Sequence, residues 1–104
     1  MAMATGFLEV YGLAAAFVAV DAGCKAAAVT VETLDKNKPG NADALPVPLI
    51  VLIKFRGTVE NVKAAVEAAA EAVSKVSGVV SKHVIANTEE STEKMLKLNA
   101  FDKK

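Results

Sequence analysis

Hydrophobic and polar positions along the chain follow two different periods, which predict strands and helices in turn. Side chains alternate over residues 5–11, 29–34 and 78–85, as is typical of strands, and the nearly continuous apolar run 47–55 is typical of a strand buried on both faces. Two intervening segments place apolar residues three or four positions apart, as amphipathic helices do. The predicted buried stripes comprise Leu13, Ala16, Phe17, Val20, Cys24 and Ala27 in the first helix, and Val59, Val62, Val66, Ala69, Val73 and Val76 in the second.

The predicted order is strand–helix–strand–strand–helix–strand, followed by a short C-terminal helix. Thr58 is placed to cap the second helix, and Asn87 or Thr88 opens the terminal one. The apolar side of that terminal helix comprises Met95, Leu96 and Leu98. Two βαβ halves in one four-stranded antiparallel sheet, with both long helices on one face, form an α+β sandwich of the ferredoxin-like type. We expect a single domain over residues 1–104.

Composition narrows the classes of partner. Twelve basic and twelve acidic residues cancel, so no positive excess exists to neutralise a phosphate backbone, which argues against nucleic acid. No uninterrupted apolar stretch reaches the about 18 residues of a membrane span, and residues 1–10 lack the basic start of a signal peptide. An apolar share of 53% is nevertheless high for so short a chain. We therefore expect part of the apolar surface to meet another subunit.

Candidate catalytic residues lack the partners that catalysis requires. His83 stands alone in the fourth predicted strand, where we expect it to be partly buried, and Cys24 lies on an apolar stripe with no second cysteine. Without a disulfide partner, Cys24 fits a reducing cytosol. Asp35 and Asp43 share a predicted loop without the dense ligand pattern of a calcium site, and Arg56 has the default role of a salt-bridged or solvated strand end. We expect neither an enzyme nor a metal or cofactor site.

Three stretches of the sequence carry a recognisable pattern, among them "FRGTVENVKAAVEAAAEAV" at residues 55–73 and "VVSKHVI" at residues 79–85. These two resemble the R-G-D-V stretch with its following helix and the V-x-x-x-H-V-I strand of bacterial microcompartment shell proteins, of the hexamer-forming, single-domain kind. The opening "GFLEVYGLAAAFVAVDAGCKAAAVTVE" is similar to the start of the family. Its matching positions are Gly6, Glu9, Gly12, Asp21, Lys25, Ala26, Ala27 and Val29.

The resemblance implies a structural protein. Family members form cyclic hexamers that tile into the shell of a protein organelle in the cytoplasm and pass small metabolites through a central pore. It therefore implies self-association, contact with other shell proteins, possible contact with enclosed enzymes, and no cofactor.

The sequence departs from the family in the segment between the second and third predicted strands, which the resemblance assigns to the pore. Family members usually carry a short glycine-serine turn between the second and third strands, whereas this chain has the longer "DKNKPGNADALPVP". The resemblance assigns to the pore loop Lys36, Asn37, Lys38, Pro39, Gly40 and Asn41. The longer segment either crowns the six-fold axis or folds over one face as a cap.

A second departure concerns the edge where hexamers meet. Lys25 matches the family's edge lysine, but Asn87 stands where the family usually has an arginine, so we expect altered tiling. The sequence leaves two other hypotheses open. Trimeric ligand sensors of the PII type share the element order and a long loop between the same strands, and a ferredoxin-like enzyme is the third possibility. The mass in solution distinguishes a hexamer from a trimer.

Overall fold

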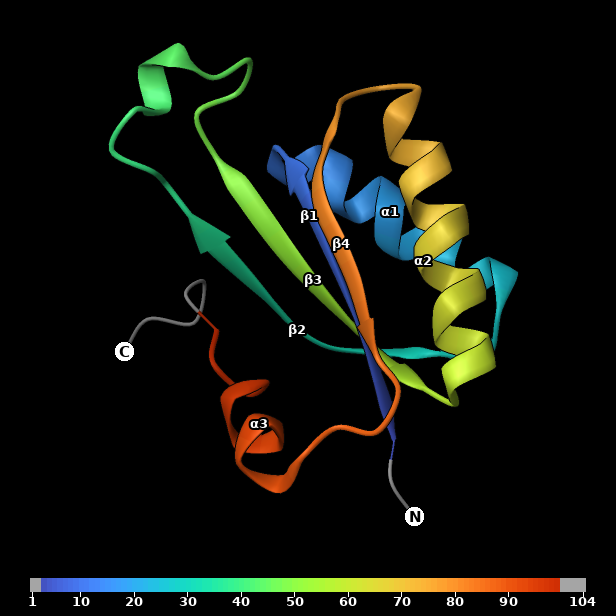
Figure 1. Cartoon of the computed structure of the whole chain (residues 1–104). Helices are drawn as coiled ribbons and strands as arrows, with labels where there is room; N and C mark the ends of the chain where they lie inside the picture. Colours follow the sequence, from blue (N-terminus) through green and yellow to red (C-terminus); the bar gives the residue numbers. More distant parts are fainter. Residues whose placement is uncertain (1–2, 100–104) are drawn as a thin grey trace.

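Four antiparallel strands form one sheet in the order β2-β3-β1-β4 (Figure 1). The computed structural model describes residues 3–99, apart from the side chain of Ala42. Its elements are β1 (Ala4–Tyr11), α1 (Leu13–Ala26), β2 (Thr30–Asn37), the short 3₁₀ helix η1 (Ala42–Ala44), β3 (Ile50–Gly57), α2 (Val59–Ser74), β4 (Val79–Ile85) and α3 (Glu90–Met95). The predicted α+β fold with its terminal helix is confirmed.

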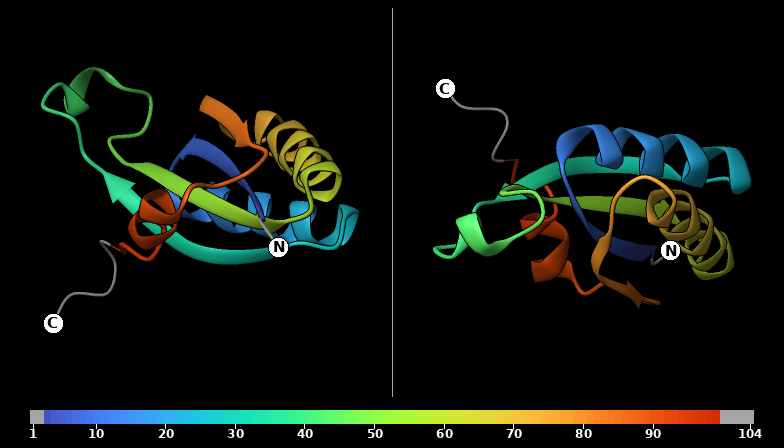
Figure 2. Two further views of the ribbon diagram at one scale, coloured as in Figure 1. Left: turned by 60° about the horizontal axis from the view of Figure 1, so that its bottom comes forward. Right: turned by 90° about the horizontal axis from the view of Figure 1, so that it is seen from above.

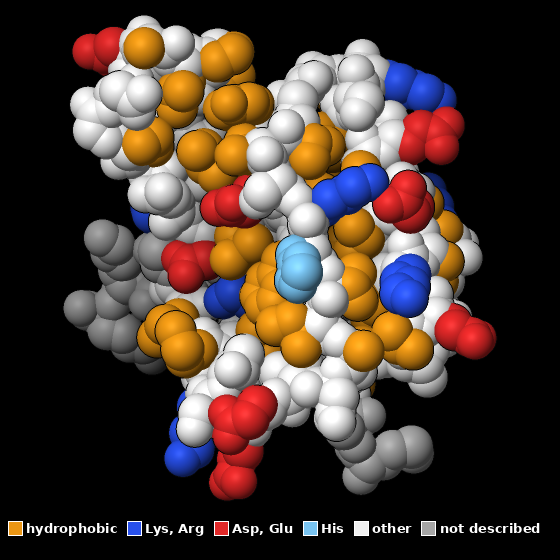
Figure 3. Space-filling model, viewed as in Figure 1, with side chains coloured by type: hydrophobic (Ala, Val, Ile, Leu, Met, Phe, Trp, Pro, Cys, Tyr) orange, Lys and Arg blue, Asp and Glu red, His pale blue; other side chains and the backbone are white. Residues whose placement is uncertain are grey.

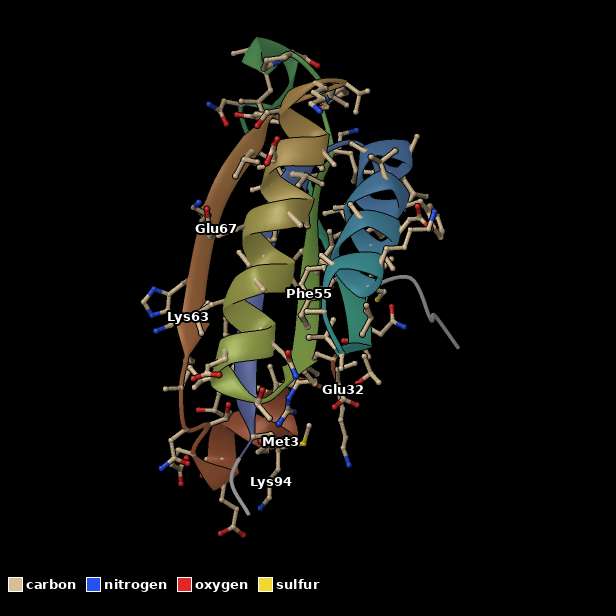
Figure 4. The ribbon with its side chains drawn as sticks, turned by 90° about the vertical axis from the view of Figure 1, so that its right-hand side faces the viewer. Met3, Glu32, Phe55, Lys63, Glu67 and Lys94 are labelled. Carbon is tan, nitrogen blue, oxygen red and sulfur yellow. The ribbon has the colours of Figure 1, made fainter. Side chains whose placement is uncertain are left out.

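The core lies between the sheet and the helices α1 and α2. Leu8 and Val10 of β1 and Phe55 of β3 are fully buried there, together with small residues and valines of the helices. Figure 4 shows Phe55 against the helical layer. Glycine is required at position 6, because a Cβ there would lie 2.6 Å from methyl groups of both Val62 and Val66. Close contact between α2 and the sheet therefore depends on a residue without a side chain.

The buried stripe of α1 differs from the predicted one. The buried residues are Ala15, Ala16, Ala19 and Gly23. Leu13 and Cys24 are exposed, and Phe17 is 61% exposed. Small side chains face the sheet and α2 because they let the helix pack closely. Leu13, Phe17 and Val18 are left exposed, whereas Val20 of the predicted stripe is partly buried against the core. The stripe of α2 is confirmed at Val62, Val66, Ala69 and Val73, whereas Val76 is exposed.

Several element boundaries are shifted relative to the sequence prediction. β2 continues to Asn37 and β3 begins at Ile50, so the connection between them runs over residues 38–49. α3 begins at Glu90 with Glu89 as its cap, later than expected, because the Glu89 carboxylate accepts a bond from the Ser91 amide. The Thr58 cap is confirmed by its hydroxyl, which accepts from the Asn61 amide. Within residues 3–99, no helix combines the length and apolar character needed to cross a membrane.

The second face of the sheet is only partly covered. α3 lies on the side of the sheet away from α1 and α2 (Figure 2) and contributes one buried apolar residue at its C-terminal end, Leu96. Met95 and Leu98 remain exposed, so the predicted apolar side of α3 is buried at one position only. Much of this face is therefore open to solvent or to a partner.

Candidate functional site

The loop over residues 38–49 extends beyond the end of the sheet where β2 finishes and β3 begins (Figure 1). Its base is tied to the start of α1, since the Gly12 amide donates to the Leu49 carbonyl at 2.9 Å. Gly12 has a φ of 94°, which favours glycine at this turn. Within the loop, the Ala44 amide donates to the Asn41 carbonyl at 2.9 Å and closes η1. Apolar side chains of the loop lie at the surface (Figure 3).

The residues assigned to the pore by the resemblance to shell proteins fall into two groups. Lys36 and Asn37 do not belong to the loop, because β2 continues through them and pairs them with Val51 and Ile50. Lys38, Pro39, Gly40 and Asn41 do lie in the loop, where all but the half-buried Pro39 are exposed. A Cβ added at Gly40 would meet no atom within 4 Å. The outer part of the loop is therefore free to contact a neighbouring molecule.

The two carboxylates expected to share this loop are separated. Asp35 lies within β2 and pairs with Leu52, whereas Asp43 belongs to η1. At the base of the loop a small hollow of about 100 Å³ is lined by Glu9, Asp35, Lys36, Asn37, Ile50 and Leu52. The Glu9 carboxylate accepts a bond from the Ser81 hydroxyl at 2.5 Å. In the described part of the chain, no three potential metal ligands gather into a metal site.

The predicted edge residues lie at the opposite end of the sheet. Lys25, near the C-terminal end of α1, is exposed and its ammonium lies 2.9 Å from the Asp21 carboxylate. Asn87 is exposed between β4 and α3. Its neighbour Thr88 is buried, where its hydroxyl and that of Thr5 are 2.7 Å apart. The backbone at Asn87 is thus anchored to β1 while its side chain remains accessible.

A buried guanidinium joins the sheet to α3, a contact that sequence reasoning did not locate. Arg56 is 5% exposed and donates from both terminal nitrogens to Glu93, at 2.7 and 2.5 Å. It also donates to the Ala4 carbonyl and lies 3.4 Å from the Glu32 carboxylate. The hydrogen bond from Arg56 lowers the pKa of Glu93 below its ordinary value. Of the two roles expected for Arg56, salt-bridged or solvated, the structure shows the first; its burial and its partner on α3 were not expected.

Lys54 makes a second link to the same segment. Lys54 is 3% exposed. Its ammonium donates to the Thr33 hydroxyl at 2.9 Å and to the carbonyls of Leu96 and Leu98 at 3.2 and 2.7 Å. Burial lowers the pKa of Lys54, and the negative charge of Asp35 acts in the opposite direction. The sequence signal was present: two cations at alternate positions of an apolar strand must share one face, which requires polar partners there.

His83, which we expected to be partly buried, and Cys24, which we expected on the buried stripe of α1, are both exposed. His83 belongs to a groove of about 360 Å³ between α2 and β4, lined also by Lys63, Val66, Glu67, Lys82 and Val84. Across this groove the Lys82 ammonium lies 2.8 Å from the Glu67 carboxylate. These side chains provide a shallow apolar floor with charged borders rather than an acid–base or nucleophilic arrangement.

The fold and these surfaces match a known family. The BMC domain model matches residues 4–88. This chain belongs to the BMC-domain family. It is 38% identical to the carboxysome shell protein CcmK1 of Thermosynechococcus vestitus, over 92% of this chain and 79% of that protein. It is 36% identical to the carboxysome shell protein CcmK2 of Synechocystis sp., over 92% of this chain and 86% of that protein.

A solved structure of a microcompartment protein from Desulfitobacterium hafniense has a similar fold. The TM-score is 0.70 at 21% identity, and the match covers 93% of this chain. This chain spans about half the length of that one, 48%. The likeness in sequence and fold identifies a structural shell protein with a BMC domain, located in a microcompartment shell, and not an enzyme. Family membership also decides against the PII-like sensor.

Proposed function

We propose that this BMC-domain chain forms cyclic hexamers that tile a microcompartment shell, with the loop 38–49 around a central pore for small metabolites. The placement of the candidate residues supports this most directly. The loop lies at one end of the strands, and Lys25 and Asn87 lie at the other. The molecule is 43 Å along its longest axis. A subunit with distinct inner and outer ends suits a ring that closes at the loop and meets other rings at its rim.

The loop sets the character of the proposed pore. Six copies of an exposed segment that contains Pro39, Pro46 and Pro48 would crowd one axis, and prolines limit how far the backbone can yield. Lys38 and Asp43 carry opposite charges, so six copies need not repel each other as six lysines alone would. We expect an opening that is narrowed or capped compared with a short glycine-serine turn.

Native mass spectrometry and light scattering test the ring directly. The proposal expects a species of six times the 10.8 kDa chain mass at micromolar concentration. A stable, soluble monomer or a trimer would overturn it. Mixing the tagged chain with a second hexamer-forming shell protein then tests partnership: joint recovery in sheets or tubes is expected, and separate recovery of each protein contradicts a shared shell. Enzymes enclosed by the shell belong to the proposed partners as well.

A further inference from the structure

A hollow with an apolar floor lies on the open face of the sheet, beside α3. It measures about 200 Å³ and is lined from the sheet by Phe7 and Leu52, and from the C-terminal segment by Met95, Leu96 and Leu98. Phe7 and Leu52 are half-buried, whereas Met95 and Leu98 are 63% and 58% exposed. Figure 3 shows apolar side chains at the surface on this side of the molecule. Apolar groups of the sheet and of the C-terminal segment therefore border one space that no described side chain fills.

The size and lining of this hollow suit one aromatic ring. An apolar cavity of about 150 Å³ is large enough to hold benzene. The lining is completed by Asp35, Lys54 and Thr92. The Lys54 ammonium already donates to the Thr33 hydroxyl and to the carbonyls of Leu96 and Leu98. The hollow therefore offers burial to an apolar side chain rather than a charge partner to an anion.

The described part of the chain ends at the wall of this hollow. Leu98, which lines it, has its carbonyl held by Lys54 at 2.7 Å, and Asn99 is the last described residue. The sequence continues with "AFDKK", residues 100–104. Phe101 stands three positions after Leu98, and three extended residues span about 10 Å. Phe101 is also the only aromatic residue that follows Phe55 in the sequence, so it is the ring that the chain itself brings nearest to the hollow.

Carboxylates stand beside the hollow on the same face of the sheet. Leu52 pairs with Glu9 on one side and with Asp35 on the other, so the three side chains share that face. Both carboxylates line the adjoining hollow of about 100 Å³, where Lys36 is the one basic residue of the lining. Two lysines end the segment "AFDKK" and match this excess of acid. Since exposed ion pairs contribute little energy, charge orients the segment and the aromatic ring supplies the main attraction.

We propose that residues 100–104, the C-terminal strap, fold back over the open face of the sheet and place the Phe101 ring in this hollow. The two lysines of the strap then lie towards the two carboxylates. The strap covers apolar surface of Phe7 and Leu52, and it adds apolar burial to α3, which the described contacts hold chiefly by charged hydrogen bonds. The contact forms within one chain, so it goes beyond the proposed ring and does not depend on it.

Tryptophan fluorescence tests the position of Phe101 in the full chain, which contains no tryptophan. Phe101→Trp should emit at a shorter wavelength than Lys104→Trp, the control in the same segment, and acrylamide should quench it several-fold less. Leu52→Ser, added to Phe101→Trp, removes part of the floor and should return the emission to that of the control. Leu52 is half-buried on the open face, so the circular dichroism spectrum should stay unchanged.

Cross-linking identifies which copy supplies the strap. In a Cys24→Ser background, Asp35→Cys and Lys103→Cys place one thiol beside the hollow and one in the strap. A short bis-maleimide should join them within one chain, which keeps the single-chain mass on a denaturing gel and yields one linked pair of peptides. Phe17→Cys with Lys103→Cys is the control. Phe17 is 61% exposed on α1, which lies on the other face of the sheet, so this pair should give no internal link (Figure 2).

Three results would overturn the strap. Emission and quenching of Phe101→Trp equal to those of Lys104→Trp would show that the ring stays in water. Covalent dimers from the pair Asp35→Cys and Lys103→Cys would place the strap of another copy in the hollow. Equal internal linking by the test pair and the control pair would show a segment without a fixed place. None of these results depends on the oligomer mass, so the proposed ring is tested separately.

Discussion

Arg56 and Lys54 are nearly buried cations at alternate positions of β3, and between them they hold α3 against the sheet. Among the described large apolar residues of this C-terminal segment, Leu96 alone is buried. Attachment of α3 therefore depends strongly on charged hydrogen bonds, which are roughly twice as strong as neutral ones. The family match ends at residue 88, so Glu93, the main partner of Arg56, lies outside the matched stretch.

Acid should loosen α3. The pKa of Glu93 is lowered in the folded chain by its bond to Arg56, so its contribution is present above the unfolded value of 4.5 and is lost as the pH falls through the lowered pKa. We expect amide exchange in α3 to accelerate below about pH 4.5, before the core strands exchange faster. Glu93→Gln should make α3 exchange quickly already at pH 7 and remove this acid step. Equal exchange in parent and variant across the range would contradict the role of Glu93.

Gly6 tests how closely α2 lies on the sheet. Gly6→Ala places a Cβ 2.6 Å from methyl groups of Val62 and Val66, and such overpacking costs about 1–3 kcal/mol of unfolding free energy. Gly40→Ala is the matched control, because a Cβ there meets no atom within 4 Å and φ is not positive. Urea denaturation should show a lower midpoint for the first variant only. An unchanged midpoint for Gly6→Ala would mean that α2 shifts away without cost.

Among the elements, the loop 38–49 is the most independent of the core. The bond at its base, from the Gly12 amide to the Leu49 carbonyl, and the bond within it, from the Ala44 amide to the Asn41 carbonyl, involve only backbone atoms. None of its described side chains is buried. Loops of this kind tolerate changes in length because their closure entropy grows slowly with the number of residues.

Shortening the loop should change the opening and spare the fold. Replacement of residues 38–45 by Gly-Ser-Gly leaves β2 and β3 paired as they are, so we expect the same circular dichroism spectrum and the same oligomer mass. A structure of the trimmed chain beside the parent should show a wider opening. Collapse of the oligomer on trimming would instead identify the loop as an assembly element.

At the scale of the whole molecule, a substitution of Lys25 distinguishes the formation of hexamers from their assembly into sheets. It is exposed at the end of the sheet remote from the loop and pairs with Asp21 on its own helix. A surface ion pair of this kind contributes little to stability. Lys25→Asp should therefore keep the fold and the hexamer mass and reduce sheets or tubes seen by electron microscopy. Lys94→Asp, an exposed change of the same charge on α3, is the control. Equal sheet formation by both variants would show that Lys25 is not at the tiling edge.

The sequence by itself determined the order of the elements, the four-stranded sheet and the buried stripe of α2. The spacing of apolar residues along a strand or helix indicates directly which of its faces is buried. The sequence also carried the family resemblance through residues such as Gly12 and Lys25. Only the tertiary structure decided which side of α1 faces the sheet. The spacing of apolar residues alone does not distinguish a stripe that is buried within the chain from one that is exposed. In α1 the alanines pack inward and Phe17 lies on the outer side. It likewise decided that β2 extends through Lys36 and Asn37 and that Arg56 meets Glu93, because ladder pairing and contacts between residues distant in sequence exist only in the folded chain.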